Sequence, residues 1–363
     1  MVARLIALLF GLWVSATSMI AIGAERDPGG DSAVAGEQQA NLGRALYILA
    51  QATVTVPGGQ GMACRYPGAD PWRCQPVRPR SRIAVIYPEG MEGGGIAYSA
   101  VIDGIEEQTH SVVVRIPVGA NRDVAQVGKE LEQNGVRRVV ALGRNGVSAA
   151  AAVSRDVDVV VGGIVWTADA DIPGNVVHTL TPDPSLLFGM LKKVTPEVRR
   201  ILVVFDPIRN AWLMRNAREV AKSLGVELIA YEATDMKKAV ATYQSMLSTA
   251  EGRRDAIWLP QDATTVEDRL IVPMVLKEAW AHNIVVFSST AAHVKQGVLF
   301  SFVPDSRQLG RRLALSFNNL PPPGERTIAF LKEGQSLVNS RTAGMLFIDS
   351  ARLAAFDLTY PEK

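Results

Sequence analysis

Strand-like and helix-like segments alternate along this chain from Arg82 onward, and this alternation constrains the fold more than any other feature. The strand-like runs are short, β-branched and almost wholly apolar, as between Ile83 and Tyr87, which is typical of strands covered on both faces. Such strands separated by amphipathic helical segments predict βαβ units and parallel sheets. The expected fold class is therefore α/β.

The expected elements form two series of similar plan. In the first series we expect strands at 83–87, 112–116, 139–142, 157–161 and 176–180, with helices at 96–107, 123–134 and 145–154. In the second we expect strands at 201–205, 227–231, 256–259, 284–287 and 298–302, with helices at 210–224, 236–249, 265–281 and 306–317. Because right-handed crossovers are the strong default, each series should form one doubly wound, Rossmann-like lobe. We expect lobe 1 at 82–180 with part of 305–335, and lobe 2 at 181–304 with 336–363.

The first 24 residues have the layout of a secretory signal peptide. Arg4 supplies positive charge, residues 5–14 form an apolar run, and small residues lead to Ala24 before the charged Glu25. This layout predicts export to the periplasm and removal of the segment. An uncleaved membrane anchor is the alternative, since the apolar stretch approaches the roughly 18 residues that can span a bilayer.

Residues 25–81 form an N-terminal extension with one expected helix at 37–51 and a loop that carries Cys64 and Cys74. Two cysteines in an exported chain favour a disulfide, with unlinked thiols as the alternative. No histidine lies in the loop to complete a zinc site.

Composition and motifs argue against several classes of function. Apolar residues make up 48% of the chain, charged residues 20%, and the net charge is only +2, so we expect a packed globular protein. The densest basic run, 73–82, is broken by prolines and lacks interleaved aromatics, so nucleic acid is not an expected partner. The Walker and G-x-S-x-G patterns are absent, the glycines at 93–95 lack dinucleotide-binding spacing, and the four histidines form no metal-spaced pair. We therefore expect neither an enzyme nor a bound cofactor or metal.

Ligands of open α/β sheets bind beyond the carboxyl ends of the strands, where helix N-termini and loop amides converge. This rule selects the candidate residues of a ligand site. They are Tyr87, Gly94, Arg144, Asn145, Asp206, Asn210, Asp262, Ser288, Ser289 and Asp305.

Five of these candidates also have a structural alternative. Asp206 and Asp262 could bind a ligand ammonium group or cap a helix. Ser288 and Ser289 could donate to a ligand carboxylate or cap the following helix. Arg144 could clamp an anion or make an ordinary surface ion pair.

Residues 187–346 carry a recognisable pattern, with LKKVTPEVRRILVVFDP from Leu191, AKSLGVEL from Ala221, DAIWLPQD from Asp255 and VNSRTA from Val338. This pattern resembles the ABC transporter substrate-binding family with the type I periplasmic binding fold. The resemblance implies two lobes, joined by a multi-stranded hinge, that close on a small solute.

In that family the solute, which is an amino acid for some members, is passed to a membrane permease with a separate ATPase. The family's ligand-side aspartate falls on Asp262, and the polar residue after the first strand of lobe 2 falls on Asn210. This chain departs from the pattern at Thr290 and at 166–174, so a periplasmic module that partners a membrane sensor is the alternative. We expect a monomer.

Overall fold

The computed structural model describes most of the chain beyond residue 81. The described residues are 53–54, 62–65, 73–76, 82–90, 96–119, 124–151, 153–154, 156–165, 174, 176–322 and 325–362. The signal peptide at 1–24, the helix at 37–51 and Gly94 lie outside them, and these expectations stay predictions. Among the described residues no helix has both the length and the apolar character needed to cross a membrane.

Contacts divide the chain into two units, Met1–Arg80 and Ser81–Lys363. The described part of the first unit is an antiparallel sheet of β1 (Thr53–Val54), β2 (Met62–Arg65) and β3 (Arg73–Pro76), in the order β1-β2-β3. The register of β2 and β3 sets the backbone of Cys64 directly opposite that of Cys74.

A six-stranded parallel sheet organises the first half of the second unit, with the order β14-β8-β7-β6-β4-β5. Its strands are β4 (Ile83–Pro88), β5 (Val114–Val118), β6 (Arg138–Leu142), β7 (Asp158–Ile164), β8 (Val176–Pro182) and β14 (Thr327–Leu331). Every residue of β8 is buried, as expected of a strand with helices over both faces.

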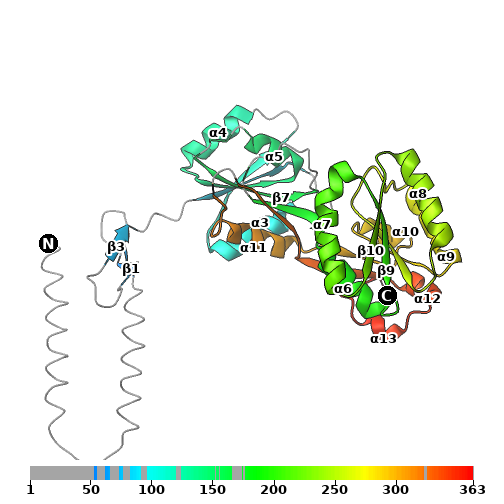
Figure 1. Ribbon diagram of the computed structural model, residues 1–363. Coiled ribbons are helices and arrows are strands. Elements are labelled where there is room, and N and C mark those ends of the chain that lie inside the picture. The colour runs from blue at the N-terminus through cyan, green and yellow to red at the C-terminus, as the bar shows by residue number, and fades with distance from the viewer. Residues whose placement is uncertain are drawn as a thin grey trace, which may run out of the picture. The chain divides into compact units, whose positions relative to one another are not determined.

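Two helices cover each face of this sheet (Figure 1). α3 (Tyr98–Thr109) and α11 (Ser306–Ser316) pack on one face, and α4 (Val124–Gln133) and α5 (Gly143–Ala150) pack on the other. α3 and α11 cross so closely that a Cβ atom on Gly310 would overlap the carbonyl oxygen of Val101. We call this sheet and its four helices lobe 1.

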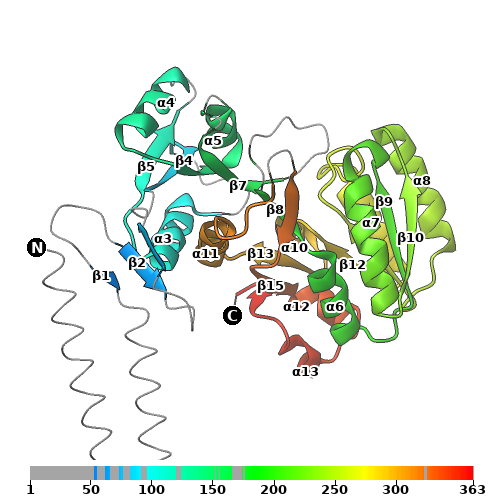
Figure 2. The ribbon, with the colours of Figure 1, turned by 60° about the vertical axis from the view of Figure 1, so that its left-hand side comes forward.

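A four-stranded parallel sheet, in the order β10-β9-β11-β12, organises lobe 2 (Figure 2). Its strands are β9 (Arg200–Phe205), β10 (Glu227–Glu232), β11 (Asp255–Leu259) and β12 (Val285–Ser288). α6 (Pro184–Val194) and α7 (Pro207–Ser223) pack on one face, and α8 (Met236–Thr249) and α9 (Ile271–Ala281) on the other.

A small mixed sheet completes lobe 2, with β13 (Phe300–Pro304), β15 (Gly334–Asn339) and β16 (Leu358–Tyr360). Three short helices accompany it, α10 (Ala292–Gln296), α12 (Ser340–Met345) and α13 (Ser350–Leu353). Phe300, Phe302 and Val338 of this sheet share one apolar core with β9 and β11.

The chain passes between the lobes three times, at the β8–α6, β13–α11 and β14–β15 junctions. These junctions are hydrogen-bonded to one another. Asp183 N–H donates to the carbonyl oxygen of Leu331 over 2.9 Å, and Asp305 N–H donates to that of Glu333 over 2.9 Å. The expected fold class, two doubly wound lobes with a multi-stranded hinge, is thereby confirmed.

Some element boundaries differ from the expected ones for local reasons. The strand expected at 112–116 begins at Val114, because His110 adopts a left-handed conformation and Ser111 N–H still donates to Glu106 at the end of α3. The helix expected from Thr265 begins at Ile271, because the carboxylates of Asp262 and Glu267 accept backbone N–H groups and hold separate turns before it.

Candidate functional site

The carboxyl ends of the two parallel sheets come together within the second unit. Thr181, near the carboxyl end of β8, donates its hydroxyl to the side-chain oxygen of Gln261, which follows β11, over 3.0 Å. Phe330 of β14, the strand that pairs with β8, stacks on Trp212 of α7 with ring centroids 4.8 Å apart and planes at 16°. The strand ends at which parallel sheets bind ligands therefore adjoin one another.

Two buried aspartates fix the loops at the rim of lobe 2. Asp206 caps α7 by accepting Ile208 N–H at 2.9 Å, and its other oxygen accepts the Thr264 hydroxyl at 2.9 Å. Asp262 accepts Thr264 N–H at 2.9 Å with one oxygen and Asp206 N–H at 2.7 Å with the other. The capping alternative is thus realised for Asp206, and both carboxylates join the loops after β9 and β11. A ligand role for either stays a prediction.

Asn210 lies in the first turn of α7, directly after the carboxyl end of β9. It is 4% exposed, its backbone N–H donates to the carbonyl oxygen of Asp206, and its side-chain amide makes no hydrogen bond with the described residues. Among the candidates in lobe 2, Asn210 therefore has the most free hydrogen-bonding capacity.

Ser288 and Ser289 are buried and engaged within lobe 2. The Ser288 hydroxyl lies 2.8 Å from Nδ1 of His293, donates to the carbonyl oxygen of Leu259 over 3.1 Å and accepts Thr290 N–H. Ser289 accepts the indole N–H of Trp258 over 3.0 Å. These contacts stabilise the turn after β12, and a ligand role for the two serines stays a prediction.

The rim of lobe 1 combines exposed polar groups with closely packed backbone. Arg144 and Asn145 are exposed in the first turn of α5, immediately after β6, and Tyr87 is half-buried at the end of β4. Gly143, directly before Arg144, has φ +63°, and a Cβ atom there would crowd the hydroxyl of Tyr98. Burial raises the pKa of the Tyr98 phenol above its ordinary value. Arg144 and Asn145 thus stand at the ligand end of lobe 1.

Asp305 belongs to the hinge. It caps α11 by accepting Gln308 N–H over 3.0 Å, directly after the β13–α11 junction. Asp183 does the same for α6 at the β8–α6 junction by accepting Ser185 N–H over 2.9 Å. The two carboxylates therefore set where the helices begin on either side of the hinge, and ligand contact by Asp305 stays a prediction.

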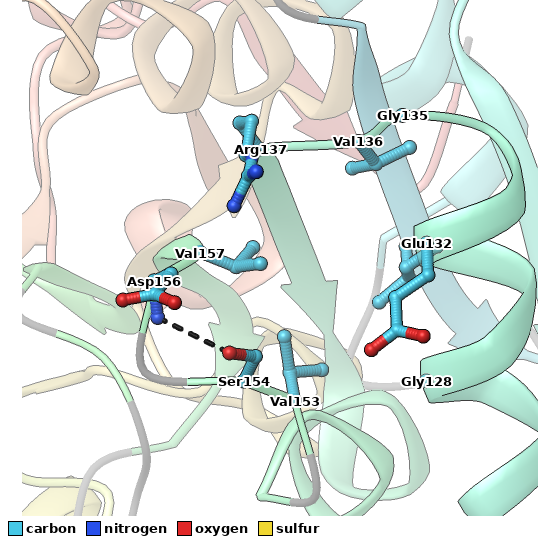
Figure 3. Close-up of a pocket in the computed structure, with 10 residues that line it drawn as sticks. Gly128, Glu132, Gly135, Val136, Arg137, Val153, Ser154, Asp156 and Val157 are labelled. Atoms are coloured by element: carbon cyan, nitrogen blue, oxygen red, sulfur yellow. Dashed lines mark hydrogen bonds between the residues drawn. The ribbon is translucent and has the colours of Figure 1, made fainter.

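A pocket of about 490 Å³ lies at the amino ends of the lobe 1 strands, opposite the candidate site (Figure 3). Figure 3 shows charged Glu132, Arg137 and Asp156 around it, with Val153 and Val157 among the apolar side chains. These residues precede or flank the amino ends of β6 and β7, so the pocket is separate from the candidate site. Among the described residues no group of acidic, histidine or cysteine side chains could hold a metal ion.

Sequence reasoning missed the contacts that join the two lobes. Thr181 and Gln261 follow the strands expected at 176–180 and 256–259, but nothing in their spacing shows that they meet. The aromatic pair of Trp212 and Phe330 had no signal at all, since Phe330 lies in a strand that the alternation did not predict.

Several solved structures are similar to this chain. A substrate-binding protein with adhesive properties from Clostridium difficile, in a ligand-free, open form, is 15% identical with a TM-score of 0.53, and the match covers 74% of this chain and 96% of that one. An ABC domain in complex with L-Trp from Streptococcus pneumonia is 18% identical with a TM-score of 0.46, over 77% and 99% of the two chains. A substrate-binding protein of a sugar ABC transport system from Bordetella parapertussis is 15% identical with a TM-score of 0.38, over 69% and 87%.

No curated protein matches this chain. The family model described as ABC transporter substrate binding protein matches residues 94–349, which is more than half of the chain. Together with the two-lobed fold described above, this match establishes that the chain belongs to the ABC transporter substrate-binding protein family.

Proposed function

We propose that this chain is the periplasmic solute receptor of an ABC importer and that it holds a small polar or amphipathic solute between its two lobes. The observation that carries the proposal is the meeting of the strand carboxyl ends at Thr181 and Gln261. Family membership supports a small-molecule ligand and a transporter partner. Amino acids are the first class of solute to test, because Arg144 can face a carboxylate and the aspartates of the lobe 2 rim an ammonium group.

Closure of the lobes is the step that would report binding to a transporter. A ligand shifts an open–closed equilibrium only by its difference in affinity for the two states, so it must contact both lobes. We assign Arg144 and Asn145 to contact it from lobe 1 and Asn210 from lobe 2. Asp206 and Asp262 hold the lobe 2 loops in place and give that rim negative charge.

A thermal-shift screen of the exported chain against amino acids, peptides and sugars tests the proposal first. A ligand that binds only the folded state raises the melting temperature. At a ligand concentration one hundred times the dissociation constant, the free energy of unfolding rises by about 2.7 kcal/mol. If no member of the panel raises it, the proposed solute class is wrong.

Matched variants then test the site by calorimetric titration of the solute found. Arg144→Ala should weaken binding about ten-fold or more, as expected for loss of a charged hydrogen bond. Arg137→Ala is the control, because Arg137 precedes the same strand, β6, at its amino end. Asn210→Ala should also weaken binding, with Asn216→Ala, further along α7, as its control. Equal effects of variant and control would refute the assignment.

The alternative function, a sensory module that partners a membrane sensor, uses the same ligand site. The genes beside this one discriminate the two, since an importer needs a permease and an ATPase whereas a sensory module needs a sensor kinase. Loss of solute uptake in a strain without this chain would favour the importer.

We also propose that the mature chain begins after Ala24 and that Cys64 and Cys74 form a disulfide. The register of β2 and β3 supports the pairing, since opposed residues of antiparallel strands have Cα atoms about 4.5–5.5 Å apart, within the range of disulfides. N-terminal sequencing of the exported protein checks the first point. Alkylation before and after reduction checks the second, with two alkyl groups expected only after reduction.

A further inference from the structure

Phe347 is held out from the surface of lobe 2 in a left-handed backbone conformation. Its φ is +56° and its side chain is 79% exposed. At the end of α12, Phe347 N–H donates to Gly344 and Ile348 N–H donates to Ala343, over 3.1 and 3.0 Å. This pair of bonds is the Schellman motif, whose left-handed position usually carries glycine because a Cβ atom there is strained.

Burial within this chain does not offset that strain. Leu346 and Ile348, on either side of Phe347, pack against the lobe 2 core, whereas Phe347 stays exposed and nearby Met345 is 52% exposed. A strained and exposed aromatic residue points to a function outside the fold of its own chain.

A small pocket of about 60 Å³ lies beside the Phe347 ring. Among the described residues, four that are not glycine have left-handed φ, and three of these, Arg253, Asn283 and Phe347, line this pocket. Arg253 N–H donates to the carbonyl oxygen of Asn283 over 3.2 Å, so the two turns are fixed to each other. The face around Phe347 is therefore built from left-handed turns, two of which are hydrogen-bonded to each other.

Opposite charges stand on the same face. Arg253 is exposed and makes no ion pair with the described residues, and Glu197 is 52% exposed with one ion pair, to Arg352 at 3.7 Å. This face therefore combines the exposed Phe347 ring and the pocket beside it with the cation of Arg253 and the anion of Glu197. Such a surface can be complementary to a second copy of itself. A twofold axis brings each such element against its complement twice.

We propose that this face binds a second copy of the chain about a twofold axis. The Phe347 ring of each copy packs at the mouth of the other copy's pocket, where Leu346 and Ile348 are partly exposed, and Arg253 of each copy pairs with Glu197 of the other. A lipid surface suits the face less well, because the carboxylate of Glu197 lies beside the ring. This proposal does not depend on the solute receptor function.

Sedimentation velocity of the exported chain, from about 1 to about 500 μM, tests it, because one small patch is expected to give a weak, micromolar dimer. The mean mass should rise toward twice the monomer mass with concentration. Phe347→Gly should abolish the rise while increasing the melting temperature by about 2 °C, since glycine relieves the backbone strain. His110→Gly is the matched control, since His110 is also exposed and left-handed, at φ +50°, but lies in lobe 1. It should raise the melting temperature and leave association unchanged.

A charge exchange tests the orientation of the two copies. Arg253→Glu and Glu197→Arg should each weaken association at least five-fold, and the double variant should restore it, because the pair is then reversed. A chain that stays monomeric at every concentration, as the sequence predicts, would overturn the proposal. Dimerisation of the Phe347→Gly variant would also overturn it. So would a wild-type chain that stays monomeric and binds vesicles containing phosphatidylglycerol, if the Phe347→Gly variant does not bind them.

Discussion

His178 should make the stability of this protein depend on pH between about 6.5 and 4. The side chain is 4% exposed in β8, its Nε2 lies 2.7 Å from the Ser316 hydroxyl, and burial followed by the positive charge of Arg312 lowers its pKa from 6.5 to about 4. The folded state therefore binds a proton less readily than the unfolded state. The stabilising contribution is fully present above pH 6.5 and is lost as pH falls toward 4.

The pKa of His178 is lowered by about 2.5, which corresponds to a total loss of roughly 3 kcal/mol in the free energy of unfolding at low pH. About 2.5 kcal/mol of this is lost by pH 4.5. Urea unfolding of the wild type and of His178→Gln, at pH values from 7.5 to 4, isolates this contribution from that of the carboxylates. The wild type should lose about 3 kcal/mol more than the variant over this range. Parallel stability curves would refute the reasoning, because they would show that His178 is not held neutral in the folded state.

Three further substitutions test the packing of the two lobes by urea unfolding. Gly310→Ala should lower the free energy of unfolding by roughly 2–3 kcal/mol, because its Cβ would overlap the Val101 carbonyl where α3 and α11 cross. A decrease below about 0.5 kcal/mol would mean that the two helices can move apart at little cost. Tyr243→Phe should increase the free energy of unfolding by about 1 kcal/mol, because the buried hydroxyl has no hydrogen-bond partner among the described residues. A decrease would show that the hydroxyl has a partner. Asp255→Asn should cost roughly 3 kcal/mol, because Asp255 is fully buried and accepts two bonds from Arg200, at 2.6 and 2.7 Å; an unchanged stability would show that this pair adds nothing.

Helix starts were predicted unevenly, even where the sequence carries a start signal. α8 begins at Met236 as expected, because Asp235 precedes it and caps Lys238 N–H. α7 begins at Pro207, three residues before the expected start, although Asp206 and Pro207 are a cap and a first-turn proline. Hydrophobic periodicity alone therefore places the body of a helix better than its first turn.

Elements that depend on tertiary partners escaped prediction. β14, β15 and β16 follow no alternation with helices, since β14 joins the lobe 1 sheet while β15 and β16 join the small sheet of lobe 2. At the site, the strand-end rule selected both Asp206 and Asp262 at the rim of lobe 2, and Asp262 accepts the backbone N–H of Asp206. It could not foresee that Ser289 is occupied by the buried indole of Trp258, because the two are 31 residues apart in sequence.

Small-angle X-ray scattering with and without saturating ligand tests the central claim most directly. The sample is the exported chain at low concentration, and the ligand is the solute that raises its melting temperature most. Because the solute is proposed to contact both lobes, the radius of gyration should fall when it binds. A bound solute that leaves the radius of gyration unchanged would contradict closure of the two lobes around it.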